Sequence, residues 1–185
     1  KKNVVAEFVD QVNPKTVFDF GANTGLFSRI ASNKNIQTMS FDIDPISVEK
    51  NYIQCLKNKV TNVLPLVLDL TNPSPGIGWE NKERTPFLKR GFADMAFCLA
   101  LIHHLAISDN VPFEKIASFF SKACDWLIIE FVPITDSQTQ LLLEGKDCAF
   151  QNYTEEIFKM EFEQYFIIQN SIKIKDSERA LYLLK

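Results

Sequence analysis

Three acidic residues, Asp19, Asp42 and Asp69, stand at or near the ends of apolar runs that are typical of buried β-strands. Because the carboxyl ends of parallel strands meet at one edge of a sheet, we expect these side chains to line one site. In alternating strand–helix chains, an acid after the second strand accepts hydrogen bonds from the hydroxyls of a ribose. Asp42 has that place in the sequence, so a nucleoside-containing ligand is the first hypothesis.

A glycine turn lies between the first apolar run and the first amphipathic segment. Its sequence is Gly21-Ala22-Asn23-Thr24-Gly25, and the two glycines can adopt positive φ and bring the backbone close to a ligand. A dinucleotide-binding loop would read G-x-G-x-x-G, but Asn23 stands at the middle glycine and Leu26 at the last one. The spacing therefore disfavours a nicotinamide cofactor without excluding it.

Four motifs together resemble the class I S-adenosylmethionine-dependent methyltransferases. The family's first motif is acid-x-Gly-x-Gly-x-Gly, and Asp19-Phe20-Gly21-Ala22-Asn23-Thr24-Gly25 matches it except at Asn23. Asn tolerates a left-handed conformation better than most residues with a side chain, so the departure is mild. The other motifs follow in the family's order and extend the resemblance over nearly the whole chain: Phe41-Asp42-Ile43-Asp44-Pro45, Leu68-Asp69-Leu70 and Leu99-Ala100-Leu101-Ile102-His103-His104-Leu105.

The resemblance implies an α/β fold of the Rossmann-like methyltransferase type. This is a three-layer αβα sandwich around a seven-stranded, mostly parallel sheet with a C-terminal antiparallel strand. It also implies S-adenosyl-L-methionine as cofactor, S-adenosyl-L-homocysteine as product and methyl transfer as the reaction. A length of 185 residues with 46% hydrophobic content fits one such domain over residues 1–185.

The same resemblance assigns the cofactor-binding residues individually. Asp42 accepts both ribose hydroxyls, and Asp19 holds the methionine ammonium through the loop or a water. Asp69 and the Leu70 backbone read the adenine edge, while Ala100 lies beside the methyl group. The glycine loop passes beneath the methionine part, and no metal ligand is implied. The complete set is Asp19, Gly21, Ala22, Asn23, Gly25, Asp42, Ile43, Asp69, Leu70 and Ala100.

Both histidines of the protein, His103 and His104, stand side by side after the fourth predicted strand, where the family places its acceptor. In one hypothesis either of them is a general base, since imidazole titrates near neutrality. In the other, the pair caps and packs the junction between strand and helix, as in many family members with the same His-His-Leu. We favour a structural role for at least one of the two.

No motif names the methyl acceptor. Carboxyl, hydroxyl and amine acceptors are all compatible with the histidine pair, and we expect a small molecule rather than a protein. The net charge of −3 argues against general binding to nucleic acid. Two other functions stay open, a non-catalytic cofactor-binding regulatory domain of a larger protein and a nicotinamide-dependent enzyme.

The composition favours a setting in which thiols stay reduced, and it predicts no membrane-spanning segment. The cysteines are far apart and form no C-x-x-C pair, which argues against zinc and is typical of reduced thiols in a cytoplasmic protein. No apolar run approaches the roughly twenty residues that cross a bilayer. The chain has neither an initiating Met nor a secretory signal, so we expect a piece of a longer protein whose N-terminal part carries the substrate-recognition surface. The four cysteines are Cys55, Cys98, Cys124 and Cys148.

Capping residues and apolar spacing predict the helices. A first helix covers residues 4–12 and ends at Asn13-Pro14. Asp44-Pro45 begins a second helix and Thr154 begins the last one. Two stripes are predicted to be buried, one of Leu26, Phe27, Ile30 and Ala31 after the glycine loop, and one of Tyr52, Ile53 and Leu56. Apolar runs at 165–168 and 180–184 predict a closing pair of strands around a turn at 176–178.

Two longer segments, 71–91 and 131–150, are expected to define the acceptor site. Trp79 in the first segment either anchors it or faces the acceptor. Glu130, just before the second segment, either orients the acceptor or meets solvent. Within the second segment a short helix at 140–144 is predicted to close at Gly145.

Overall fold

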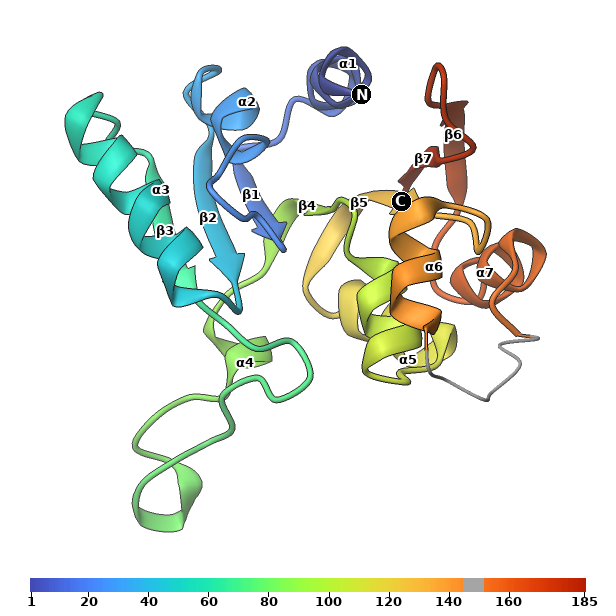
Figure 1. Cartoon of the computed structure of the whole chain (residues 1–185). Helices are drawn as coiled ribbons and strands as arrows, with labels where there is room; N and C mark the ends of the chain where they lie inside the picture. Colours follow the sequence, from blue (N-terminus) through green and yellow to red (C-terminus); the bar gives the residue numbers. More distant parts are fainter. Residues whose placement is uncertain (145–151) are drawn as a thin grey trace.

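The computed structural model describes residues 1–144 and 152–185, and its centre is one seven-stranded sheet (Figure 1). The strand order is β3-β2-β1-β4-β5-β7-β6. β7 runs antiparallel to both neighbours, and the other adjacent pairs are parallel. The strands are β1 (Thr16–Phe20), β2 (Gln37–Asp42), β3 (Val63–Val67), β4 (Ala93–Cys98), β5 (Cys124–Phe131), β6 (Ile168–Lys173) and β7 (Ala180–Leu184). The predicted sheet with its reversed C-terminal strand is confirmed.

Helices cover both faces of this sheet and complete the three predicted layers (Figure 1). One face carries α1 (Lys2–Val12), α2 (Ser28–Ser32) and α3 (Pro45–Lys57). The other carries α4 (Phe87–Arg90), α5 (Phe113–Ser121) and α7 (Glu155–Phe162). The remaining elements are α6 (Ser137–Leu143), the π-helical turn η2 (His104–Ser108) that contacts it, and the single turn η1 (Trp79–Asn81).

Alternating side chains of β1 supply both hydrophobic cores. Val17 faces the α1 side and packs in a cluster with Phe8, while Phe18 and Phe20 face the α5 side. The Phe20 ring stacks on Phe41 of β2 with centroids 5.2 Å apart, and Phe18 meets Phe41 edge-on at 5.5 Å. Because aromatic pairs of this kind bury large areas, the middle of the sheet is a rigid support for the loops at its edge.

Three predicted helix boundaries are confirmed. α1 ends at Asn13, which adopts a left-handed conformation with φ 51°. The Asp44 side chain accepts hydrogen bonds from the first turn of α3, and Pro45 is the first residue of that helix. Thr154 Oγ1 accepts the Ile157 N–H at 3.2 Å and so caps α7. Each cap satisfies a backbone group that a helix end leaves free.

The predicted buried stripe of α3 is wrong. Tyr52, Ile53 and Leu56 are 52%, 40% and 59% exposed. The helix instead turns the smaller and more polar Asn51 and Cys55 toward the sheet. A polar partner on β2 explains this choice, because a buried amide that is hydrogen-bonded replaces the apolar contact that hydrophobicity alone predicts.

The stripe predicted after the glycine loop is correct only in part. Ala31 is fully buried, and Phe27 and Ile30 pack partly buried against the same core. Leu26 is exposed, because α2 begins only at Ser28 and Leu26 lies in the turn before it.

The closing strand pair is confirmed, but its first strand begins later than predicted. β6 starts at Ile168. The N–H groups of Tyr165 and Phe166 donate to the Phe162 carbonyl and so continue the end of α7. The turn follows as predicted, with Asp176 in a left-handed conformation at φ 58°.

Residues 72–91 form an arm that extends away from the sheet, at the lower left of Figure 1. An antiparallel bridge between Ile77 and Arg84 joins its two sides, and α4 returns the chain to the body. Trp79 is 80% exposed, so the prediction that it anchors this segment is wrong.

Three cysteines, Cys55, Cys98 and Cys124, are free and buried. Cys98 is a fully buried core residue. Cys148 and the helix end predicted at Gly145 lie outside the described residues. Among the helices that the structure describes, none is both long and apolar enough to cross a membrane.

Candidate functional site

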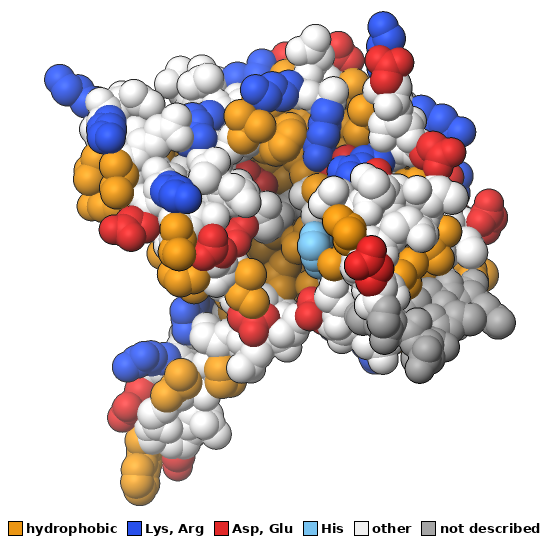
Figure 2. Space-filling view, viewed as in Figure 1, with side chains coloured by type: hydrophobic (Ala, Val, Ile, Leu, Met, Phe, Trp, Pro, Cys, Tyr) orange, Lys and Arg blue, Asp and Glu red, His pale blue; other side chains and the backbone are white. Residues whose placement is uncertain are grey.

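A cleft of about 390 Å³ lies where β1, β2 and β4 end and the chain leaves β3. Figure 2 shows this face of the molecule hollowed between its two halves, with a histidine on the wall. Most of the predicted site residues line the cleft: Gly21, Asn23, Asp42, Ile43, Asp69, Leu70, Ala100 and His104. The other four, Asp19, Ala22, Gly25 and His103, are buried behind that lining.

A second cavity of about 420 Å³ lies on the α4 side of the sheet. Its walls are mainly apolar and include Phe18, Met39, Leu66 and Phe87. It contains Asp69 but neither the glycine loop nor Asp42. Of the two cavities, only the cleft therefore brings the predicted polar groups together.

Asp42 is held in place by two backbone groups. Its Oδ2 accepts the Asn23 N–H at 2.7 Å, and its Oδ1 accepts the Asp44 N–H at 2.9 Å. A carboxylate has about four acceptor positions, so each oxygen keeps one for a ligand. Two fixed acceptors side by side suit a pair of adjacent hydroxyls.

The glycine loop has the conformation that its sequence predicts. Gly21, Asn23 and Gly25 all have positive φ, at 70°, 50° and 76°. A Cβ on Gly21 would lie 3.2 Å from the Leu101 side chain at the cleft, whereas a Cβ on Gly25 would lie 2.2 Å from Asn51 Oδ1. Both glycines therefore have a close neighbour within the protein, the Leu101 side chain at Gly21 and the much closer Asn51 amide at Gly25.

Asn51, a residue outside all the predicted site motifs, fixes this loop to α3. Its Nδ2 donates to Ser40 Oγ at 2.9 Å, and its Oδ1 accepts from Arg29 Nη1 at 3.0 Å. Arg29 Nη2 also donates to the Thr24 carbonyl at 2.5 Å, which closes the link. The available signal is an asparagine in the middle of a helix, where Asn is unfavourable unless its side chain binds elsewhere.

Asp19 is a carboxylate with almost no access to water. It is 1% exposed, and its Oδ2 accepts a hydrogen bond from Ser28 Oγ at 2.5 Å. Burial raises the pKa of Asp19 to about 7, and the Ser28 hydrogen bond opposes that rise only in part. The side chain is thus partly protonated near neutral pH and would gain from a cationic partner.

Asp69 and Leu70 form the opposite rim of the cleft. Asp69 Oδ1 accepts from both the N–H and the Oγ1 of Thr71, at 2.8 and 2.7 Å. These bonds lower the pKa of Asp69, so this carboxylate is ionised at neutral pH. Asp69 also lines the cleft, next to Leu70.

Ala100 occupies a strained position in the cleft wall. Its φ of 52° is unusual for a residue with a Cβ. Such conformations cost about 1–3 kcal/mol and gather at functional sites. Here the strained turn leads the chain from β4 into the histidine pair.

The two histidines have different environments. His104 is exposed to the cleft, whereas His103 is 2% exposed and its Nδ1 has no hydrogen-bond partner within the described residues. The rings lie 4.3 Å apart between centroids. Burial and the neighbouring His104 lower the pKa of His103 to about 4, so it is neutral at physiological pH. Of the pair, His104 is the one that a ligand can reach.

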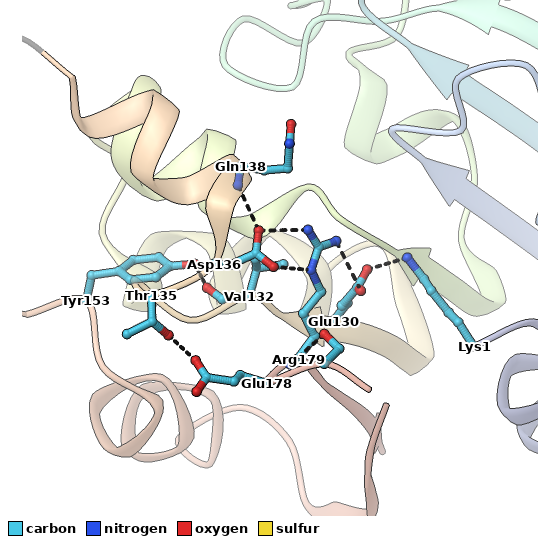
Figure 3. A network of polar contacts seen from close by, with 10 residues as sticks. Lys1, Glu130, Val132, Thr135, Asp136, Gln138, Tyr153, Glu178 and Arg179 are labelled. Atoms are coloured by element: carbon cyan, nitrogen blue, oxygen red, sulfur yellow. Dashed lines mark hydrogen bonds and ion pairs between the residues drawn. The ribbon is translucent and has the colours of Figure 1, made fainter. Parts of the chain in front are cut away.

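The Glu130 side chain is not exposed, so the prediction that it meets solvent is wrong. It does not line the cleft either. It is fully buried, and Lys1 Nζ lies 2.5 Å from its Oε2 (Figure 3). Arg179 Nη1 lies 3.7 Å from its Oε1, and Arg179 also grips Asp136 with two hydrogen bonds of 2.7 and 2.8 Å. We call Lys1, Glu130, Asp136 and Arg179 the ion-pair network.

Comparison with known sequences gives one clear relative. No family model matches this chain. Nodulation protein NoeA of Rhizobium meliloti (strain 1021) is 39% identical over 183 residues, which is 98% of this chain. The chain spans only 38% of that protein.

Solved structures share the architecture at lower identity. WbdD, a bifunctional kinase-methyltransferase, matches all of this chain and 39% of its own, with a TM-score of 0.68 and 14% identity. Magnesium protoporphyrin IX methyltransferase (ChlM) from Synechocystis PCC 6803, solved with bound S-adenosylhomocysteine (SAH), matches 99% of this chain and 80% of its own. Its TM-score is 0.66 and its identity 19%. This chain has the methyltransferase fold. The fold that the four motifs indicate is thereby confirmed.

We expect Gly25→Ala to lower the free energy of unfolding by about 2–4 kcal/mol, because it strains the left-handed backbone and displaces the Asn51 amide. Urea denaturation measures the change. Gly91→Ala is the matched control, since a Cβ there meets only Phe18 at 3.6 Å. We expect the control to stay within about 0.5 kcal/mol of wild type. Equal losses in the two variants would contradict the close packing of Gly25 on Asn51.

We expect Asp19→Asn to stabilise the ligand-free protein progressively as pH rises. The folded-state pKa of about 7 exceeds the ordinary value of 3.8, so between these values the folded protein keeps a proton that the unfolded chain has lost. The wild-type free energy of unfolding therefore loses about 4 kcal/mol from this group over that range. Urea denaturation of both proteins at about pH 4 and about pH 8 measures the difference.

His103 changes the free energy of unfolding with pH in the opposite direction. Its folded-state pKa of about 4 lies below the ordinary 6.5, so it costs stability as pH falls through that range. His103 is common to both proteins and cancels when the variant is compared with wild type at each pH. A difference between Asp19→Asn and wild type that does not grow with pH would contradict a buried, protonated Asp19.

Proposed function

We propose that the cleft binds S-adenosyl-L-methionine and that the protein transfers its methyl group to an acceptor. The observation that carries this proposal is the fixed Asp42 carboxylate beside the glycine loop, with one acceptor position free on each oxygen. The methyltransferase fold and the SAH bound to ChlM support it.

Each end of the cofactor has a suitable group in the cleft. The ribose diol would bind Asp42, and the adenine would lie between Ile43 and the Asp69–Leu70 rim. The methionine part would pass over Gly21, Ala22, Asn23 and Gly25, with its ammonium directed toward Asp19. Within the described residues the buried Asp19 carboxylate has no ion pair, so a cation there would favour its ionised form. The sulfonium methyl would then lie beside Ala100.

The reaction is an in-line displacement. The methyl carbon leaves the sulfonium sulfur and bonds to the acceptor atom, and the electron pair of the broken C–S bond stays on sulfur, which becomes a neutral thioether. A hydroxyl or amine acceptor also loses a proton, which His104 can take because it lines the cleft. Positioning the acceptor against the methyl can supply up to about 7–11 kcal/mol of the barrier reduction.

The alternative is a domain that binds the cofactor without catalysis. The chain spans only 38% of NoeA. What a protein of NoeA's full length does is therefore a separate question from the activity of this domain. Free thiols at Cys55, Cys98 and Cys124 support a cytoplasmic setting, where thiols stay reduced. A nicotinamide-dependent enzyme is disfavoured, because the glycine spacing and the reversed β7 both depart from the dinucleotide-binding pattern.

We expect Asp42→Ala to weaken binding of S-adenosylmethionine and SAH by at least about 2 kcal/mol, because the ribose hydroxyls lose their acceptors in a partly dry cleft. Isothermal titration measures the affinity. Asp125→Ala is the control, since Asp125 is exposed at the opposite end of β5. Unchanged affinity in a folded Asp42→Ala variant would refute the assignment. Tight binding with no methyl transfer to any acceptor class would favour the non-catalytic alternative.

A further inference from the structure

The second cavity, which we call the α4 cavity, has no role in the proposed function. It has a volume of about 420 Å³ and shares Phe41, Leu68 and Asp69 with the cleft, but it contains neither Asp42 nor the glycine loop. Sites for small molecules are concave, mainly apolar and about 300–1,000 Å³ in volume, with a few polar groups that orient the ligand. The α4 cavity has these properties, so it is a candidate for a second ligand.

The cavity is open because the helix between β3 and β4 is too short to cover the sheet. α4 has four residues and lies at the root of the arm in Figure 1, whereas α3 on the opposite face has thirteen. Met39 of β2 and Leu66 of β3 line the cavity and are 40% and 38% exposed. Parallel sheets normally have both faces covered, so these side chains would gain from an apolar partner. Their exposure also shows that a ligand can reach the cavity from solvent.

Three segments enclose the α4 cavity, and this shape suits a small molecule better than a flat macromolecular surface. The strands form one wall, α4 contributes Phe87 and Arg90, and the start of the arm contributes Asn72 and Ser74. The Ser74 carbonyl accepts the Phe87 N–H at 2.9 Å and so joins the last two walls. The walls are therefore held together before a ligand binds.

Three phenylalanine rings form part of the apolar lining. Phe41 contacts both Phe18 and Phe87 edge-on, with ring centroids 5.5 Å apart in each pair. Aromatic rings favour edge-to-face and offset contacts with further rings, because their edges are positive and their faces negative. An aromatic ligand can therefore extend this row of rings over the uncovered part of the sheet.

Arg90 determines the preferred charge of the ligand. Among the lining residues that the structure describes, only Arg90 and Asp69 are charged. Arg90 Nε donates to the Thr85 carbonyl at 2.6 Å, and within the described residues its guanidinium forms no ion pair. Asp69, by contrast, already accepts two hydrogen bonds from Thr71. Because a guanidinium binds a carboxylate through paired N–H donors, the cavity favours an anion.

We infer that the α4 cavity is a second ligand site, separate from the cleft, for a small aromatic molecule that carries one anionic group. The rings of the ligand lie against Phe18, Phe41 and Phe87, and its anionic group binds the exposed Arg90 guanidinium. Asp69, on the wall next to the cleft, disfavours a second negative charge on the ligand. The inference goes beyond the proposed function and does not depend on what the cleft binds.

Three naphthalenes with one substituent at the same ring position test the inference: naphthoate, which is anionic, naphthamide, which is neutral, and naphthylmethylamine, which is cationic at neutral pH. Ligand-observed NMR measures their dissociation constants for the ligand-free protein. We expect naphthoate to bind at least about tenfold more tightly than either of the others. Equal binding of the three, preference for the amine, or no binding of naphthoate would overturn the inference.

Arg90→Gln tests the charge contact. The variant loses the positive charge but keeps an N–H donor for the Thr85 carbonyl. We expect it to bind naphthoate at least about tenfold more weakly, with the affinity for naphthamide unchanged. Lys89→Gln is the matched control, because Lys89 is an exposed neighbour on α4 that does not line the cavity. Equal losses in the two variants, or none in Arg90→Gln, would contradict the role of Arg90.

Leu66→Trp tests the location, because the larger side chain fills part of the cavity. Leu64→Trp is its control: Leu64 lies two residues away on the same edge strand and is 52% exposed, but it does not line the cavity. We expect Leu66→Trp to weaken both naphthoate and naphthamide at least about tenfold, and Leu64→Trp to weaken neither. Equal effects of the two substitutions would place the probes outside the cavity and refute the site. If Leu66→Trp does not fold, Arg90→Gln still decides the inference.

Discussion

The two hydrogen bonds that Asp42 accepts, from the Asn23 N–H at 2.7 Å and the Asp44 N–H at 2.9 Å, join the glycine loop to the start of α3. Because both donors belong to the backbone, the carboxylate is oriented before any ligand arrives. Asn51 supports the same junction from behind through Arg29 and Ser40. The shape of the cleft therefore depends on these hydrogen bonds between the glycine loop and the start of α3. The aromatic core supports the two segments from below.

These hydrogen bonds belong to a site where several groups destabilise the ligand-free protein. Within the described residues Asp19 is a buried carboxyl with no ion pair, Ala100 has a left-handed backbone, and His103 Nδ1 has no hydrogen-bond partner. Each feature opposes folding, and all of them lie at the carboxyl edge of the sheet. Concentration of unfavourable groups at one edge is expected where binding supplies the missing interactions.

The sequence predicts those parts that depend on local backbone chemistry. The strand end at Asp42, the left-handed Asn23 and the caps at Asp44 and Thr154 follow from residue type and spacing. The buried face of α3 does not, because Asn51 pairs with Ser40 on another element and leaves apolar Tyr52 at the surface. The ion pair between Glu130 and Lys1 cannot be predicted from the sequence either, since the two residues are 129 positions apart and such a contact has no periodic signature.

The most direct measurement is a crystal structure of the protein with SAH. We expect both ribose hydroxyls within hydrogen-bond distance of the Asp42 carboxylate and the thioether sulfur beside Ala100. A nucleoside found instead in the apolar cavity next to Phe87, or a ribose without contact to Asp42, would contradict the central claim that the fixed Asp42 carboxylate defines the cofactor site.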